Sequence, residues 1–118
     1  MQRNLYGIAN CDKVKAARAW LAQRGIDAAF HDFKRQAPTP ALLAGWLQQL
    51  DWTELVNRKG LTWKQLPQAR RDALVDADAA IALMLDKPSV IRRPVLELDG
   101  RVHVGFDAAE YSRLFAKA

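Results

Sequence analysis

Cysteine and histidine are scarce in this chain of 118 residues, which contains one cysteine, Cys11, and two histidines, His31 and His103. A single cysteine excludes any disulfide bond within the chain. Zinc-type sites need several Cys or His ligands at short spacings, and these three residues lie far apart in the sequence. We therefore expect no bound cofactor and no metal-binding residues, and we expect both histidines to lie on strands or at the surface.

Long apolar runs are also absent. No segment approaches the roughly 20 apolar residues that a membrane-spanning helix requires, and the first residues form no apolar signal segment. Half of the residues are hydrophobic, as in ordinary globular proteins, and low-complexity tracts are missing. The sequence predicts a cytoplasmic protein that does not bind membranes and forms a single domain over residues 1–118.

The formal net charge is +5. Such a charge attracts nucleic acids, acidic proteins and anionic small molecules alike, so it does not choose among them. The basic residues are dispersed along the chain, and the short pairs at 34–35 and 70–71 are typical of solvated surface. We therefore expect no nucleic-acid partner.

The first third of the chain predicts a strand, a helix and a second, parallel strand. Residues 5–8 are a short apolar run, and Asn10 is a candidate cap for a helix that continues to Gln23 and ends before Gly25. Residues 28–33 then alternate between apolar and polar side chains, as in a half-buried strand.

The remainder predicts a helical insertion followed by a hairpin and a last helix. Residues 39–87 contain helical patterns capped by Thr39 and Asp76. Asp99-Gly100 between two apolar runs is a hairpin signal, and Asp107 can cap a final helix. The fold class is therefore α/β, with the helical insertion between βαβ and ββα halves.

Cys11 is the candidate nucleophile because it follows a strand and precedes a helix. A helix amino terminus presents unpaired N–H groups and a partial positive charge, which favour a thiolate. Lys13 and Lys15 flank Cys11, and Arg93 lies in a basic run far downstream. A lone cysteine is more often a small buried hydrophobe, but this combination favours a reactive thiol.

Four segments resemble the arsenate reductase (ArsC) family, in particular its YffB-like branch, along nearly the whole chain. They are Leu-Tyr-Gly-Ile-Ala-Asn-Cys-Asp at 5–12, Phe-His-Asp at 30–32, Asn-Arg-Lys-Gly with Thr-Trp-Lys at 57–64, and Arg-Arg-Pro-Val at 92–95. The resemblance implies a thioredoxin-like (glutaredoxin-like) fold with Cys11 as the catalytic thiol. It also implies that Arg58 and Arg93 lie near Cys11 and that Pro94 is a cis-proline facing the active-site loop.

Departures from the patterns of two branches of the family bear on activity. Glutaredoxin-linked arsenate reductases resemble this chain but place His four residues before the cysteine and Arg four residues after it, where Gly7 and Lys15 stand here. Their third anion-binding arginine corresponds to a position near Gly105, so a tetrahedral oxyanion loses a bidentate clamp. The related Spx-type regulators often carry Cys-x-x-Cys, and Val14 occupies the second cysteine's position here, which excludes an internal disulfide switch.

These features predict a monothiol reductase that uses glutathione as co-substrate, because an adduct on Cys11 can be released only by an outside thiol. We expect substrate- or glutathione-binding roles for the side chains of Asn10, Lys13, Lys15, Arg58, Arg93 and Pro94. Simpler alternatives remain: Asn10 as a helix cap, the lysines as solvated helix residues, Arg58 as a cap for local carbonyls and Pro94 as the start of a strand.

Two other functions stay open. One is an arsenate reductase that uses glutathione and glutaredoxin, and the other is a redox-responsive regulator that docks on a protein, as Spx-type relatives dock on RNA polymerase. The expected partners are glutathione and a disulfide or other small-molecule substrate, with glutaredoxin as a further candidate, and we expect a monomer.

Overall fold

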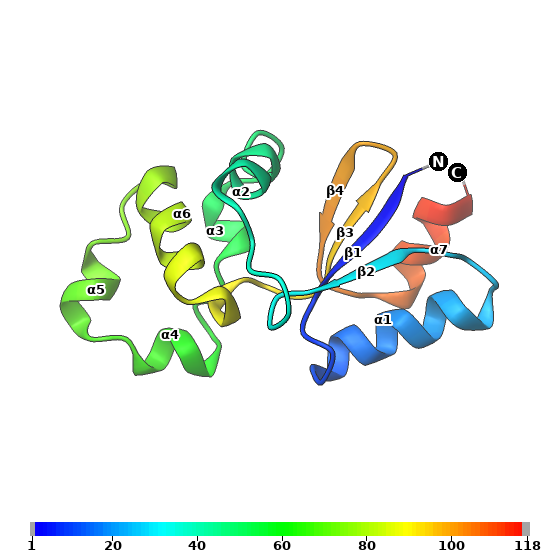
Figure 1. Cartoon of the computed structure of the whole chain (residues 1–118), viewed down its shortest axis with the longest axis horizontal. Coiled ribbons are helices and arrows are strands. Elements are labelled where there is room, and N and C mark those ends of the chain that lie inside the picture. Colours follow the sequence, from blue (N-terminus) through cyan, green and yellow to red (C-terminus); the bar gives the residue numbers. More distant parts are fainter. Residues whose placement is uncertain (1, 117–118) are drawn as a thin grey trace. The chain divides into compact units, whose positions relative to one another are not determined.

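The computed structural model describes residues 2–116 and divides the chain into two compact units (Figure 1). One unit combines the residues up to Gln36 with those from Arg93 onward, and the other is Ala37–Arg92. The helical insertion expected over about 39–87 corresponds to the second unit. The assignment of residues 1–118 to one domain stays a prediction.

A four-stranded sheet forms the first unit. Its strands are β1 (Arg3–Gly7), β2 (Ala29–Asp32), β3 (Val95–Leu98) and β4 (Arg101–Val104), in the order β2-β1-β3-β4. β1 runs parallel to β2 and antiparallel to β3, so β1 and β2 end at the edge of the sheet where β3 begins. We call this the Cys11 edge, because the chain leaves β1 there and reaches Cys11.

Two helices, α1 (Asp12–Gln23) and α7 (Ala108–Ala116), supply side chains to a core shared with the sheet. Its buried members are Leu5, Ala17, Trp20, Leu21, Leu96, Leu98 and Tyr111. Leu5 pairs with Leu96 across the β1–β3 ladder, so both point to the same face of the sheet. This core fixes α1, and therefore its first turn, against β1.

The hairpin and the caps follow the sequence signals. Asp99 and Gly100 both have positive φ, 51° and 84°, as the tight turn between β3 and β4 requires. Asp107 caps α7, because its Oδ1 accepts hydrogen bonds from the backbone N–H groups of Ala109 and Glu110 at 2.8 and 3.3 Å. The expected hairpin and final helix are confirmed.

The second unit is built from short helices. They are α2 (Pro40–Trp46), α3 (Trp52–Leu55), α4 (Leu61–Gln65), α5 (Gln68–Asp72), α6 (Ala77–Asp86) and the 3₁₀ turn η1 (Pro88–Val90). Thr39 and Asp76 cap α2 and α6 as expected, accepting from the N–H groups of Leu42 and Ala79. The unit has its own buried core, which includes Leu43, Trp46, Leu55, Met84 and Ile91.

The parallel β1-α1-β2 unit followed, after the helical insertion, by β3-β4-α7 gives an α/β, thioredoxin-like (glutaredoxin-like) fold, as expected. None of the helices within residues 2–116 combines the length and the apolar character that a bilayer crossing requires.

Candidate active site

Cys11 is the N-cap residue of α1. Its backbone is extended, with φ −82° and ψ 131°, and the helix begins at Asp12. The expectation that Asn10 caps this helix is wrong. The N–H of Cys11 donates to the carbonyl of Ile8 at 3.0 Å, and this tight turn moves the helix boundary one residue past the exposed Asn10. The Cys11 carbonyl then accepts the N–H of Lys15 at 2.9 Å.

Gly7 allows α1 to approach the end of β1 closely. A Cβ atom at Gly7 would lie 2.6 Å from Cγ2 of Val14, which is fully buried in the first turn of the helix. The histidine that arsenate reductases of the resembling type carry at this position has no room beside Val14. The departure from the family pattern at Gly7 therefore has a packing reason.

Arg93 and Pro94 precede β3 and so lie at the Cys11 edge. The Arg93–Pro94 peptide bond is cis, as the resemblance implied, and Pro94 is buried. The carbonyl of Pro94 accepts the N–H of Gly105 at 2.8 Å, which ties this segment to the end of β4. The backbone that follows Arg93 is therefore anchored at Pro94.

The thiol of Cys11 is partly exposed, and its pKa lies below the ordinary value. Partial burial opposes ionisation and is the largest single influence on the pKa. It is outweighed by the Val14 backbone N–H, the Arg93 side chain and the Lys13 backbone N–H, which all favour the thiolate, together with the charge of Arg93. Cys11 and Arg93, 82 positions apart in the sequence, are thus brought together.

The lysines contribute differently from the sequence-based expectation. Lys13 acts on the sulfur through its backbone N–H, and its side chain is exposed. Lys15 is also exposed, and its backbone N–H donates to the carbonyl of Cys11. Side-chain roles for both lysines stay predictions. Sequence reasoning missed Val14, whose contribution comes from a backbone N–H that any residue other than proline would supply.

Arg58 belongs to the second unit, in the loop between α3 and α4. The Asn57 side chain accepts the N–H of Lys59 at 3.1 Å, and the Asn57 N–H donates to the carbonyl of Val90 at 2.8 Å, so this loop is anchored at its start. Arg58 itself is exposed. Its expected place beside Cys11 stays a prediction, as does the role of Asn10.

The reactive group that the described residues provide at this site is the Cys11 thiolate. No group of three or more His, Cys, Asp or Glu side chains suited to a metal ion occurs within residues 2–116. A cysteine with a lowered pKa beside a guanidinium group can attack a sulfur or another electrophilic centre that carries or develops negative charge.

Several known proteins are similar to this chain over nearly its whole length. A solved structure described as the YffB (PA3664) protein is 41% identical, covers 95% of this chain and 97% of its own, and superposes with a TM-score of 0.90. An arsenate reductase (ArsC) related protein from Brucella melitensis is 45% identical over 98% of this chain and 95% of its own, with a TM-score of 0.77. An uncharacterised protein of Haemophilus influenzae is 35% identical over 95% of this chain and 97% of its own.

The family model of the ArsC family matches residues 6–114, which include Cys11, Arg93 and Pro94. A match of this extent covers most of both segments of the sheet unit and the whole helical unit. The chain therefore belongs to the ArsC family.

Proposed function

We propose that the protein is a monothiol reductase that uses glutathione to reduce a disulfide or another oxidised, anionic substrate. The observation that carries this proposal is the position of the free, partly exposed Cys11 at the amino terminus of α1, where the helix start and the Arg93 side chain lower the pKa of its thiol. Membership of the ArsC family and relatives described as arsenate reductase related support thiol-dependent reduction in general.

The reaction takes two steps in which sulfur atoms exchange partners. The Cys11 thiolate attacks the glutathionyl sulfur of a mixed disulfide, the Cys11–glutathione disulfide forms, and the original S–S bond breaks. The leaving thiolate takes a proton from water. A second glutathione thiolate then attacks the glutathionyl sulfur on Cys11, which releases oxidised glutathione and restores the thiolate. In total, the mixed disulfide and one molecule of glutathione become the free thiol and oxidised glutathione, so one disulfide bond is exchanged for another.

Glutathione must act from outside because the chain contains no second cysteine to resolve the adduct. Arg93 would hold a glutathione carboxylate beside the sulfur, and Pro94 would present backbone next to it. Asn10, Lys13 and Lys15 are exposed and lie within four residues of Cys11, which supports them as candidates for substrate or glutathione binding. Arg58 is a candidate for a second carboxylate of glutathione.

Arsenate reduction with glutathione and glutaredoxin is the second candidate, favoured by the relative described as an arsenate reductase (ArsC) related protein. The crowding between Gly7 and Val14 opposes it, because it leaves no space for a side chain that would help to bind the oxyanion. A regulator controlled by an internal disulfide is opposed by the buried Val14 at the position of a second cysteine.

The test offers glutathione with either a glutathione mixed disulfide or arsenate to the wild-type protein and to Cys11→Ser. We expect turnover of the mixed disulfide alone, and its loss in Cys11→Ser. Turnover of arsenate would select the second candidate. Equal rates for wild type and Cys11→Ser with every substrate would overturn the assignment of Cys11 as nucleophile.

A further inference from the structure

A cavity of about 450 Å³ opens next to the loop that carries Cys11, in the sheet unit. Its lining includes Ala9, which lies two residues before Cys11, Arg18 from α1, Phe30 and Asp32 from β2, and Arg35 from the turn after β2. This volume falls within the range of about 300–1,000 Å³ that is usual for small-molecule sites. The roles proposed above for Cys11 and Arg93 do not use this cavity.

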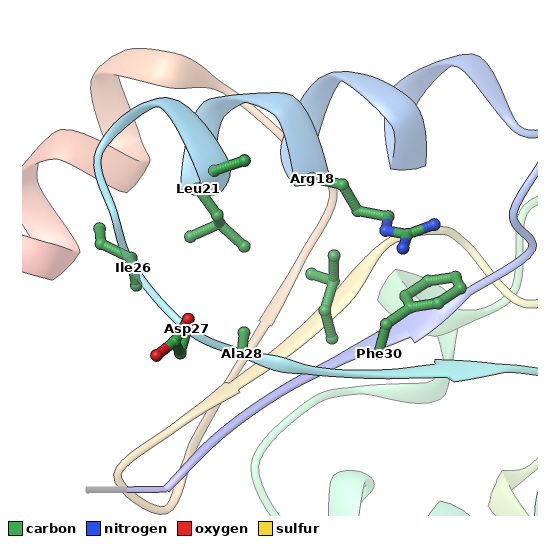
Figure 2. A pocket seen from close by; sticks show the side chains of 8 residues that line it. Arg18, Leu21, Ile26, Asp27, Ala28 and Phe30 are labelled. Atoms are coloured by element: carbon green, nitrogen blue, oxygen red, sulfur yellow. The ribbon is translucent and has the colours of Figure 1, made fainter.

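Arg18 is held in a defined position. Its guanidinium carbon lies 4.2 Å from the centre of the Phe30 ring, and Figure 2 shows the side chain reaching from α1 to the ring on β2. A stacked guanidinium uses its flat face on the ring and keeps its N–H edges available for an oxyanion. Arg18 and Phe30 also line the smaller neighbouring pocket of about 210 Å³ drawn in Figure 2.

The cavity carries positive charge. Within residues 2–116, neither Arg18 nor Arg35 forms an ion pair, since the ion pair found there joins Arg70 to Asp86. Asp32 also lines the cavity, and its Oδ1 accepts the backbone N–H of Lys34 at 2.9 Å. Two guanidinium groups against one carboxylate leave a net positive lining that favours an anion.

The strand order places this cavity and Arg93 beside different neighbours of β1. β1, which leads to Cys11, lies between β2 and β3 in the sheet. The cavity is at the end of β2, whereas Arg93 and the cis-proline precede β3. The cavity and the segment that carries Arg93 therefore flank the strand that leads to Cys11.

The distance along α1 between Cys11 and Arg18 sets the length of the substrate arm that fits between the sulfur and the guanidinium group. Arg18 follows Cys11 by seven residues, nearly two turns of helix, which corresponds to about 10 Å along the axis. Long side chains on a helix lean back toward its amino terminus, so the Arg18 side chain extends toward the end of α1 that carries Cys11. A carboxylate separated from the sulfur by several carbon atoms matches this reach.

We propose that the cavity binds the leaving half of the disulfide substrate and selects a carboxylate carried on an arm of several carbons, through Arg18 and Arg35. This inference rests on the proposed disulfide reduction. In the first step the glutathionyl sulfur bonds to Cys11, the bond to the leaving sulfur breaks, and that sulfur departs with the electron pair and takes a proton from water. The carboxylate stays bound to the guanidinium groups during the exchange.

The test compares two mixed disulfides of glutathione that differ only at the end of the leaving arm, one made with 6-mercaptohexanoate and one with 6-mercaptohexanol. Each is given to wild type, Arg18→Gln, Arg35→Gln and Arg24→Gln. Arg24 is the matched control, because it stacks on Trp20 at 4.0 Å near the other end of α1 and lines neither cavity.

We expect wild type to prefer the carboxylate disulfide by about tenfold in kcat/KM, the size of one charge-assisted hydrogen bond in a partly exposed site. Arg18→Gln and Arg35→Gln should each bring the kcat/KM values for the two disulfides close together, and Arg24→Gln, which lies outside the cavity, should retain the wild-type preference. Equal kcat/KM for both disulfides in wild type would overturn the cavity proposal, and continued turnover of the alcohol disulfide would leave the proposed reduction intact.

Binding provides a readout that does not need turnover. The affinities of Cys11→Ser for the two intact disulfides can be measured by calorimetry, with and without Arg18→Gln. A preference for the carboxylate disulfide that disappears with Arg18→Gln would support the cavity even if neither disulfide is reduced. Equal affinities would reject it.

Discussion

At Cys11, opposing influences act on one sulfur atom. Burial favours the protonated thiol, and two N–H groups and a guanidinium group favour the thiolate more strongly. Two of these donors belong to the backbone of α1 and are present in any sequence that starts a helix there. The third is a side chain, Arg93, and it is the one that a substitution can remove without disturbing the helix.

Arg93→Gln should raise the pKa of Cys11, because it removes the charge of Arg93 and one of the hydrogen bonds that favour the thiolate. The measurement is the rate of alkylation by iodoacetamide as a function of pH, whose midpoint reports the pKa. Wild type should have a midpoint below that of a free cysteine, and Arg93→Gln should move it upward. Arg24→Gln should keep the wild-type midpoint; a wild-type curve that matches free cysteine would contradict the thiolate.

Gly7→Ala should reduce the free energy of unfolding by about 1–3 kcal/mol, because the new methyl group would overlap the buried Val14 side chain. Val14 is β-branched and fully buried, so it cannot rotate away easily. Urea denaturation of Gly7→Ala, Val14→Ala and the double variant measures this. The double variant should be more stable than the sum of the single effects predicts, by at least about 0.5 kcal/mol. Strict additivity would show that the two side chains do not compete for space.

At the scale of elements, hydrophobic periodicity and capping residues predicted the positions of most helices and strands. The helix after Cys11, the Asp99-Gly100 hairpin and the helices capped by Thr39 and Asp76 all form where the sequence indicates. β1 instead begins at Arg3, because its pairing with β3 aligns Arg3 with Leu98, a contact between distant segments that no local pattern reveals. α5, with five residues, is too short to show a helical period and was not predicted.

The hydroxyl of Tyr111, on the aromatic face of α7, is buried, and its effect on stability can be tested. Tyr111 is 1% exposed and packs against Trp20 and Phe106, and within residues 2–116 its hydroxyl has no hydrogen-bond partner. Burial, followed by the nearby Glu110 carboxylate, raises the pKa of Tyr111. Tyr111→Phe should therefore increase the free energy of unfolding by about 1 kcal/mol, since it removes a buried polar group that gains nothing in the folded state.

Tyr6→Phe is the matched control. The Tyr6 hydroxyl donates to the Glu97 carboxylate at 3.3 Å, and burial, the charge of Glu97 and this bond raise the pKa of Tyr6 to about 12. Its loss should lower the free energy of unfolding by about 1 kcal/mol. Thermal or urea denaturation of both variants measures whether the free energy of unfolding rises or falls in each. A loss of stability in Tyr111→Phe would show that the Tyr111 hydroxyl has a hydrogen-bond partner in the wild-type protein.

At the scale of the whole molecule, the fold class and the insertion were accessible from sequence, whereas the full site was not. Helical patterns over residues 39–87 against strand patterns on both sides predicted an insertion, and the helical unit spans Ala37–Arg92. The resemblance suggested that Arg93 lies near Cys11, and the β1–β3 pairing supplies the reason. The cavity with Arg18 and Arg35 escaped notice because its lining comes from a helix, a strand and a turn whose spacing follows no motif.

The net charge of +5 should accelerate reaction of Cys11 with anionic reagents. The second-order rate with the dianionic reagent 5,5′-dithiobis(2-nitrobenzoate) should fall severalfold between about 0.01 M and about 1 M ionic strength, over which the Debye length shrinks from about 30 Å to about 3 Å. The rate with the neutral 2,2′-dithiodipyridine should stay nearly constant. Equal salt dependence for both reagents would rule out attraction by the protein's charge.

The order in which the two halves of the sheet unit are synthesised has a consequence for the nascent chain. The ribosome delivers Cys11 more than 80 residues before Arg93, and β3 pairs with β1 only once the helical segment between them has emerged. Until then the sulfur lacks its guanidinium neighbour and remains more protonated. The full nucleophilicity of Cys11 therefore arises only once β3 has paired with β1.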